Sequence, residues 1–286
     1  MSNVYLNWFT TDEQFPFFIQ YGGHEEDMSL HKHADFSELV IVLNGHATHV
    51  VNDEESFIKK GNVFVISGGT PHAYKAPYDF KICNIMYKAE MLKSAGPDLR
   101  TLNGYQALFV LEPFYRSING FKSKLNLPIA SLEHVSAFIA AMIKEYEEKQ
   151  QGYQTMLASR FMELVVYLSR HYENQEAGTD NSLMHLASAI SYIEDHYCEQ
   201  ITLEDIAAQS RISVRHLNRI FRAYYQTTPI AYIQRLRLEL ACTLLRGSRH
   251  SITEISYMCG FNDSNYLTRQ FKKAYGMSPK TYRGNS

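Results

Sequence analysis

Cysteine is scarce in this chain, and its few cysteines lie far apart. The sequence has four, none of them in a CxxC pair: Cys83, Cys198, Cys242 and Cys259. Zinc clusters and the disulfide frameworks of small secreted domains use closely spaced cysteines. Neither is predicted here, and we expect buried thiols in a reducing compartment.

Long hydrophobic runs are also missing. The longest aliphatic run, LVIVL at 39–43, is much shorter than the roughly 20 apolar residues that a membrane helix needs. No basic leader followed by an apolar segment opens the sequence. We therefore expect a cytoplasmic protein without a membrane partner. With 286 residues, 45% of them hydrophobic, the chain is long enough for two domains.

A net charge of −2 conceals an uneven distribution of charge. Residues 1–182 contain 15 Lys and Arg against 22 Asp and Glu, whereas residues 183–286 contain 13 against 8. A basic domain has nucleic acid as its obvious polyanionic partner. The alternative is an ordinary solvated surface, and charge alone does not decide between them.

The hydrophobic period changes along the chain. Residues 31–90 contain short β-branched and aromatic runs (SELVIVL, ATHVV, NVFVIS, KICNIMY) between turn residues, which predicts an antiparallel sheet or barrel. Apolar residues then recur at helical spacing, predicting amphipathic helices at 131–149 and 153–172. The fold class is therefore α+β, with a helical region after the sheet.

A polar stretch separates this first part from the last third. ENQEAGTDNS at 173–182 contains glycine and lacks apolar periodicity, which is typical of a linker. We place a first domain at 1–175, the linker at 176–182 and an all-helical domain at 183–286.

The last third contains an internal repeat. Residues 201–232 align with 252–282 at a spacing of about 50, and the matches include Leu217 with Leu267, Arg219 with Arg269 and Phe221 with Phe271. Such a duplication indicates a repeated structural unit.

Each copy has the pattern of a short helix, a tight turn and a second helix. We expect Thr202 and Thr253 to open the first helices, and Ser213 and Asp263 to open the second ones by accepting hydrogen bonds from free amides. The second turn has Gly260, which can adopt positive φ, whereas the first has Arg211 in its place. This is the helix-turn-helix pattern, whose second helix enters the DNA major groove. A single copy could equally be a simple helical corner.

Polar residues on the two second helices are candidate DNA contacts. Arginine pairs well with guanine and asparagine with adenine. The candidates are Arg215, Asn218 and Arg219 in the first copy, and Asp263, Ser264, Asn265, Thr268 and Arg269 in the second. Between the copies, residues 229–247 predict one long helix, with Pro229 in its first turn and Gly247 at its end. This helix would fix the separation of two helices in successive grooves, which is about 34 Å.

The segment ISYMCGFNDSNYLTRQFKKAYGMSPKTYR, at 255–283, is similar to the DNA-binding signature of the AraC/XylS family of bacterial transcription regulators. It departs from the family at Ser256, where alanine is common, and Gln226 stands where a glycine usually precedes Thr/Ser-Pro. Within the family, EISYMCGFNDSNYL and HADFSELVIVLNGHATHVVN most resemble the corresponding segments of the L-rhamnose-responsive activators.

Two segments of the predicted sheet resemble the two motifs of the cupin β-barrel: HKHADFSELVIVLNG from residue 31 and GNVFVISGGTPH from residue 61. The resemblance implies a metal site of His31, His33, Glu38 and His72. Glu25, Ser67 and Ala76 depart from the motifs. Imidazoles with a carboxylate suit Fe, Mn, Zn or Ni.

Three interpretations of this pocket compete. One is a metal-dependent cupin enzyme acting on a sugar, and another is a metal-holding pocket without catalysis. We favour a third, a metal-free pocket in which His33, Glu38, His72 and Tyr74 bind sugar hydroxyls. Some of these histidines, His31 above all, could instead be satisfied core or rim residues; we assign no role to His24, His46 and His49.

The resemblance also implies how the parts work together. The helices at 131–149 and 153–172 would form a homodimer or would merely cap the barrel. A monosaccharide, L-rhamnose first, would control an activator of a sugar catabolic operon bound to promoter DNA. Acidic Glu254 or Asp263 would contact the RNA polymerase sigma factor. The leading function is thus a transcription regulator and not an enzyme.

Overall fold

The computed structural model describes residues 2–10, 12, 14–93, 96–113, 124–176 and 182–284. The chain forms two compact units, Met1–Ala187 and Ser188–Ser286. Most of the predicted linker, residues 177–181, lies outside the described residues, and α6 (Tyr153–Glu176) continues through the first residues of the polar stretch. The predicted domain bounds therefore stay a prediction.

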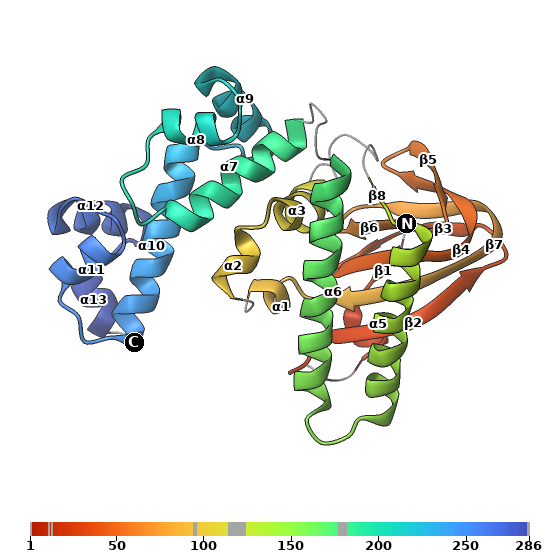
Figure 1. The fold of residues 1–286 in the computed structure, drawn as a ribbon. Helices are drawn as coiled ribbons and strands as arrows, with labels where there is room; N and C mark the ends of the chain where they lie inside the picture. The colour runs from red at the N-terminus through yellow and green to blue at the C-terminus, as the bar shows by residue number, and fades with distance from the viewer. Residues whose placement is uncertain are drawn as a thin grey trace. The chain divides into compact units, whose positions relative to one another are not determined.

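The first unit is built on a sheet of eight described strands (Figure 1). These are β1 (Ser2–Val4), β2 (Phe17–His24), β3 (Met28–His33), β4 (Ser37–Val51), β5 (Glu54–Lys59), β6 (Asn62–Ile66), β7 (His72–Tyr87) and β8 (Leu125–Asn126). Short helical segments lie between them: η1 (Leu6–Trp8), α1 (Glu90–Lys93), α2 (Pro97–Arg100), α3 (Asn103–Tyr105) and η2 (Gln106–Leu111).

Two long strands hold the sheet together. The first half of β4 pairs with β6 and the second half with β5, while β7 pairs with β4 along most of its length. β7 also pairs with β3 near its start and with β2 near its end. The sheet folds over in this way, but the described strands do not close it into a hydrogen-bonded barrel, because β1 and β8 end the strand order. The predicted cupin-like β domain is confirmed, as an open sheet.

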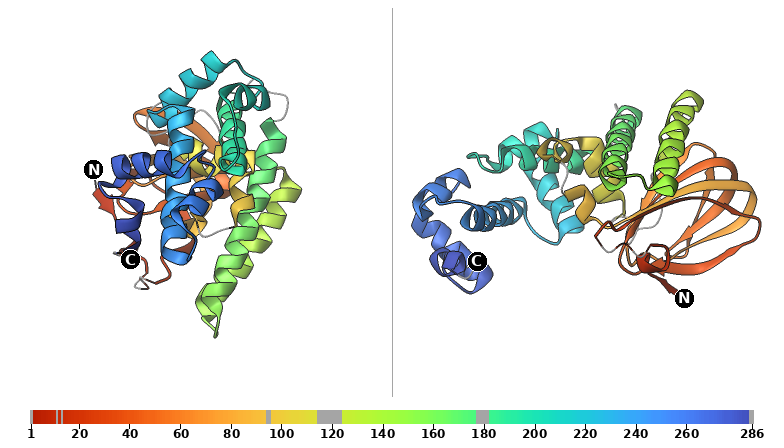
Figure 2. Two further views of the ribbon diagram at one scale, coloured as in Figure 1. Left: turned by 90° about the vertical axis from the view of Figure 1, so that its left-hand side faces the viewer. Right: turned by 90° about the horizontal axis from the view of Figure 1, so that it is seen from below.

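Alternation along the strands creates two apolar faces. Val40, Val42, Phe64 and Ile82 belong to the core inside the folded sheet. On the opposite face, Phe17 and Tyr87 contact Phe161 of α6. Helices α5 (Ile129–Glu148) and α6 lie along this face (Figures 1 and 2). Their apolar stripes are therefore buried against the sheet.

The second unit is helical, as predicted. Its helices are α7 (Ser182–His196), which begins before the division of the units, α8 (Leu203–Gln209), α9 (Val214–Tyr225), α10 (Pro229–Gly247), α11 (Ile252–Met258), α12 (Ser264–Tyr275) and α13 (Pro279–Gly284). The predicted long helix is α10, with Pro229 at its first position and Thr228 as its N-cap. In Figure 1, α10 runs from the α8–α9 pair to the α11–α12 pair.

No helix in the described part of the chain combines the length and the apolar character that crossing a bilayer requires.

Candidate DNA-binding surface and ligand pocket

The first helix-turn-helix consists of α8 and α9. Thr202 caps α8 and forms a reciprocal capping box with Asp205. Ser213 caps α9 by accepting the amide hydrogen of His216 at 3.2 Å. On α9, Leu217 and Phe221 are fully buried, as the sequence predicted.

The second helix-turn-helix, α11 and α12, repeats this construction with one correction. Asp263 caps α12 and accepts the amide hydrogen of Tyr266 at 2.7 Å, as expected. The residue that caps α11, however, is Ser251, paired with Glu254 in a capping box, and Thr253 lies inside the helix. The prediction of Thr253 was wrong because a serine two residues earlier completes the S-x-x-E pattern.

Both turns use the left-handed backbone conformation. Gly260 has φ +79°, and a Cβ built there would lie 2.4 Å from the carbonyl oxygen of Cys198. Arg211 adopts φ +57° in the first turn, although it has a side chain. Arg211 is therefore strained in the first turn, because its Cβ disfavours positive φ, whereas Gly260 adopts the same conformation in the second turn without strain.

Four of the candidate DNA contacts project from the two second helices without being buried. Arg215 and Arg219 of α9 and Asn265 and Arg269 of α12 are exposed. Arg219 also contacts the His216 ring nitrogen at 3.2 Å, and the Arg269 guanidinium lies over the Tyr266 ring at 5.5 Å.

The other candidates are half-buried or occupied within their own helices. Asn218 donates a hydrogen bond to the Val214 carbonyl at 3.0 Å, and Thr268 to the Ser264 carbonyl at 2.7 Å. Asp263 serves as the N-cap described above, while Ser264 is half-buried. The side chains of Asn218, Asp263 and Thr268 therefore support their helices first, and a base contact would have to share or replace these bonds.

Polar side chains that are half-buried or exposed connect α10 and the two motifs. Arg237 donates hydrogen bonds to the carbonyl oxygens of Tyr197 and Glu199, both at 2.6 Å. Gln234 donates to the Tyr266 hydroxyl of α12 at 2.8 Å, and Gln200 donates to the Gly260 carbonyl at 3.0 Å. The sequence did not mark these residues, because only the packed helices bring them together.

The first unit contains a cavity of about 310 Å³ between the strands. Its lining is mixed polar and apolar: Ser2, Val4, Phe9, Gln20, His24, Met28, Ser29, His31, His33, Glu38, Asn84 and Met86. The strand register explains this set, since Gln20 pairs with Asn84 and Glu38 with Met86 on the inner face. The volume suits a small ligand.

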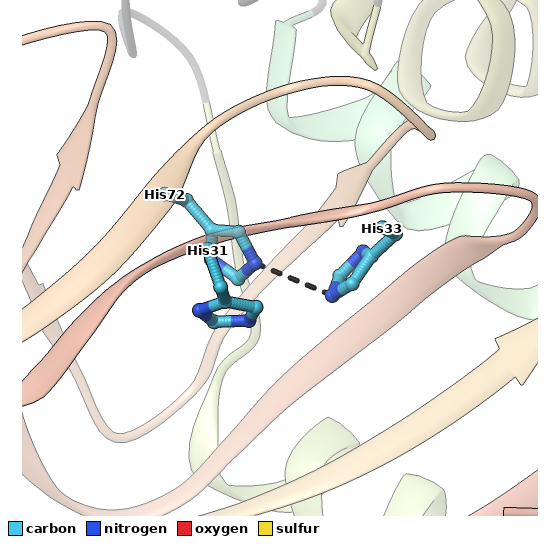
Figure 3. Close-up of side chains that lie close together, drawn as sticks. All are labelled: His31, His33 and His72. Atoms are coloured by element: carbon cyan, nitrogen blue, oxygen red, sulfur yellow. Dashed lines mark hydrogen bonds between the residues drawn. The ribbon is translucent and has the colours of Figure 1, made fainter. Parts of the chain in front are cut away.

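Three imidazoles lie close together (Figure 3), and two of them, those of His31 and His33, line this cavity. His31, His33 and His72 each offer one ligand atom within 4.8 Å of the others. Nε2 of His72 lies 3.3 Å from Nε2 of His33, and Glu38 Oε2 lies 3.7 Å from the latter. Behind them, His49 Nε2 contacts His72 Nδ1 at 3.4 Å.

Burial keeps these groups uncharged in the absence of a bound ion. Desolvation lowers the pKa of His33 to about 3 and lowers the pKa of His72 well below its usual value. Desolvation also raises the pKa of Glu38 to about 8. At neutral pH the contact between His33 and Glu38 therefore joins a neutral imidazole to a carboxylic acid rather than two ions.

The structure divides the predicted ligand residues into two groups. His33 and Glu38 line the cavity, whereas His72 and Tyr74 are fully buried and lie behind its lining. The sequence did not single out Gln20 and Asn84, and no role was assigned to His24 and His49. The period-two position of Gln20 and His24 on β2 was a usable signal, but the pairing of β2 with β7 was needed to place them.

Two family models match the chain. A helix-turn-helix domain matches residues 206–285, and an AraC-like ligand binding domain matches residues 16–165. The second match alone spans more than half of the chain.

Named relatives match over most of their length. The HTH-type transcriptional activator RhaR of Mannheimia succiniciproducens is 29% identical over 273 residues, covering 95% of this chain and 92% of the relative. The HTH-type transcriptional activator RhaS of Klebsiella pneumoniae is 31% identical over 257 residues, covering 88% and 86%. Among solved structures, the DNA-binding domain of AdpA in complex with a target DNA is 31% identical, covers 35% of this chain and 90% of that chain, and has a TM-score of 0.34.

These relatives are transcription regulators and not enzymes, so the alternative of a cupin enzyme is set aside. The duplicated helix-turn-helix and the β domain with its cavity agree with both family models. The chain belongs to the AraC family and is a DNA-binding transcriptional activator with a ligand-binding domain.

Proposed function

We propose that a monosaccharide bound in the β domain controls this activator, and that L-rhamnose is the sugar. The observation that carries the proposal is the small cavity, in which Gln20, Glu38 and Asn84 offer hydrogen-bond groups beside Met28 and Met86. Sugars present hydroxyls and apolar ring faces together, which such a lining matches. The resemblance to RhaR and RhaS supports rhamnose among the sugars.

The regulated activity is binding to promoter DNA of a sugar catabolic operon in the bacterial cytoplasm. We propose that α9 and α12 enter successive major grooves, with Arg215, Arg219, Asn265 and Arg269 as the leading contacts. Asn218, Asp263, Ser264 and Thr268 would contact DNA or support the helix ends. Sugar can change transcription only by favouring one arrangement of the two domains and the linker at 176–182 over another.

A thermal-shift experiment on the full chain tests the sugar. L-rhamnose should raise the melting temperature, because a ligand of the native state stabilises it. L-mannose is the matched control, since it differs only by a hydroxyl on C6. Asn84→Ala should lose the shift, whereas His46→Ala, outside the cavity lining, should keep it. A screen in which no monosaccharide raises the melting temperature contradicts the proposal.

We also propose a homodimer formed through α5. The solvent-facing side of this helix has Glu133, Ala137, Ala140 and Lys144 exposed in succession, and its two alanines allow a second helix to approach closely. Ala137→Glu should convert a dimer into a monomer in analytical ultracentrifugation. Lys60→Glu introduces a glutamate at an exposed position of the β5–β6 turn and should leave the dimer intact. A wild-type monomer at all concentrations would contradict this proposal.

A contact with the sigma factor is proposed at Glu254 or Asp263. Both carboxylates cap helices, so removing them outright would disturb the fold. Glu254→Gln and Asp263→Asn retain capping groups and remove the charge. One of these variants should keep DNA affinity and lose activation in a reconstituted transcription assay. Full activation by both variants would exclude the contact.

A further inference from the structure

We propose that an aromatic ring one helical turn before an arginine positions that arginine in each helix-turn-helix motif. The positioning residues are His216 for Arg219 on α9 and Tyr266 for Arg269 on α12. Each ring holds the guanidinium of its arginine and so sets the base preference of that arginine on DNA. The inference rests on the proposed function, because it takes both arginines as contacts to bases.

The two pairs occupy equivalent positions of the internal repeat. The spacing of 50 that matches Arg219 with Arg269 also matches His216 with Tyr266. Residues three apart on a helix are neighbours, and side chains lean toward the helix N-terminus. Each arginine therefore lies over the turn that contains the ring, and both copies place a ring beside an arginine.

A hydrogen bond joins the pair in the first motif. Nη2 of Arg219 lies 3.2 Å from Nε2 of His216. Because a guanidinium only donates, the ring nitrogen accepts this bond, and the imidazole carries its proton on Nδ1. The backbone amide of His216 in turn donates to the N-cap Ser213 at 3.2 Å. His216 is half-buried and Arg219 is exposed, so the more buried ring holds the more exposed arginine.

In the second motif the arginine lies over the ring face. The Arg269 guanidinium carbon is 5.5 Å from the centroid of the Tyr266 ring, which is a cation–π distance. The ring is itself fixed, because it packs against the apolar core that α10, α11 and α12 share. Its hydroxyl also accepts a hydrogen bond of 2.8 Å from Gln234 of α10. The long helix therefore supports Arg269 through Tyr266.

Positioning affects base readout because the pairing of arginine with guanine is directional. Two N–H groups of one guanidinium must face N7 and O6 of the same guanine. An arginine loses side-chain freedom when it is fixed in this way, and a ring that already restricts the side chain reduces the loss. Contacts to phosphates carry no base preference. Removing the ring should therefore reduce base preference more than affinity for DNA in general.

Competition binding of the full chain tests the second pair. The duplexes are one enriched from a random pool by the wild-type chain and versions of it with single base pairs replaced. Arg269→Ala identifies the base pair whose preference depends on Arg269. Tyr266→Ala should reduce the preference at this base pair by about 3- to 10-fold, whereas Tyr266→Phe, which keeps the ring face, should retain it. Tyr257→Ala removes an exposed tyrosine of α11 and is the matched control, which should retain it.

His216→Ala and His216→Gln test the first pair in the same way. The glutamine side-chain oxygen can accept the hydrogen bond of Arg219, so His216→Gln should keep more of the base preference than His216→Ala. Circular dichroism verifies that all variants fold. An unchanged base preference in one of the alanine variants overturns the positioning role of that ring.

A double-mutant cycle separates positioning from support of the helix. In an Arg269→Ala background, Tyr266→Ala should cause little further loss of affinity for the enriched duplex, because the arginine that the ring positions is absent. Equal losses with and without Arg269 would mean that the ring only supports the fold, and would overturn the inference.

The same variants distinguish failure of the inference from failure of the proposed function. If every base preference survives Arg269→Ala and Arg219→Ala, the proposed base contacts are wrong and the inference falls with them. Base preferences that depend on the arginines but not on the rings overturn the inference alone and leave the proposed function standing.

Discussion

Arg237 of α10 holds the carbonyl oxygens of Tyr197 and Glu199 with two hydrogen bonds of 2.6 Å. These carbonyls follow α7, just before α8 begins. The guanidinium also lies 5.9 Å from the ring centroid of Phe261, at the turn of the second motif. One side chain therefore ties the long helix to segments next to both helix-turn-helix motifs.

Replacing Arg237 should loosen the spacing of the two motifs. Hydrogen bonds from a charged donor contribute about 1.5–3 kcal/mol, so Arg237→Met should lower the stability of the second unit by about that amount. Hydrogen exchange should rise in α8 and α11. Arg235→Met, an exposed neighbour on α10, should change exchange much less. Equal exchange in both variants would show that the Arg237 bonds do not hold the motifs.

Two glycines in left-handed conformations should respond differently to alanine. Gly260 and Gly276 have φ of +79° and +73°, but a Cβ meets the Cys198 carbonyl oxygen only at Gly260. Gly276→Ala should therefore lower the free energy of unfolding by only about 1–2 kcal/mol, the cost of placing a residue with a Cβ in the left-handed conformation. Gly260→Ala should lower the free energy of unfolding distinctly more, because the backbone at Cys198 must also move to make room for the Cβ. Equal changes in melting temperature would argue against the close approach at Cys198.

The N-cap of α11 can be located by two alanine substitutions. Ser251→Ala removes the side chain that accepts the Glu254 amide hydrogen, and should cost about 0.5–2 kcal/mol. Thr253→Ala lies inside the helix, where alanine is the better helix former, and should be neutral or slightly stabilising. Urea unfolding of both variants checks this, and the reverse order would restore Thr253 as the cap.

Burial of Glu38 should make the β domain less stable as pH rises. The pKa of Glu38 is about 8 in the folded state against an ordinary value of 4.5, so the folded state keeps a proton that the unfolded chain releases. The contribution of this proton to the free energy of unfolding is complete below about pH 4.5. It falls by up to about 1.4 kcal/mol per pH unit until about pH 8. Glutamine does not titrate, so Glu38→Gln lacks this pH-dependent contribution to stability.

Urea unfolding in chelator at about pH 5 and about pH 7 measures the effect. The stability of Glu38→Gln relative to wild type should increase with pH. A difference that stays constant over this range would mean that Glu38 is ionised in the folded protein.

Local chemistry allowed much of the second unit to be predicted. The N-caps Ser213 and Asp263 depend on residues within one helical turn, and the bounds of α10 follow from Pro229 and Gly247. The cap of α11 was missed although the repeat offset of 49 at Asp205 and Glu254 also places Ser251 opposite Thr202.

The β domain was less predictable, because long-range pairing determines it. SELVIVL and ATHVV form one continuous strand, β4, and not two. That strand places His49 opposite Tyr74 and Val51 opposite His72, and so brings His49 to the imidazole cluster. Alternation in the sequence shows which residues share a face of a strand, but it does not show which strands are neighbours.

Selection of bound sequences from a random DNA duplex pool tests most directly whether α9 and α12 bind successive grooves. The full chain should enrich pairs of conserved patches with centres about 10–10.5 base pairs apart. Arg219→Ala should reduce the base preference in one patch and Arg269→Ala the base preference in the other, each by about 1–3 kcal/mol of binding free energy. Lys280→Ala of α13 should retain the base preference in both patches. Enrichment of a single patch, or of patches without fixed spacing, would contradict the account.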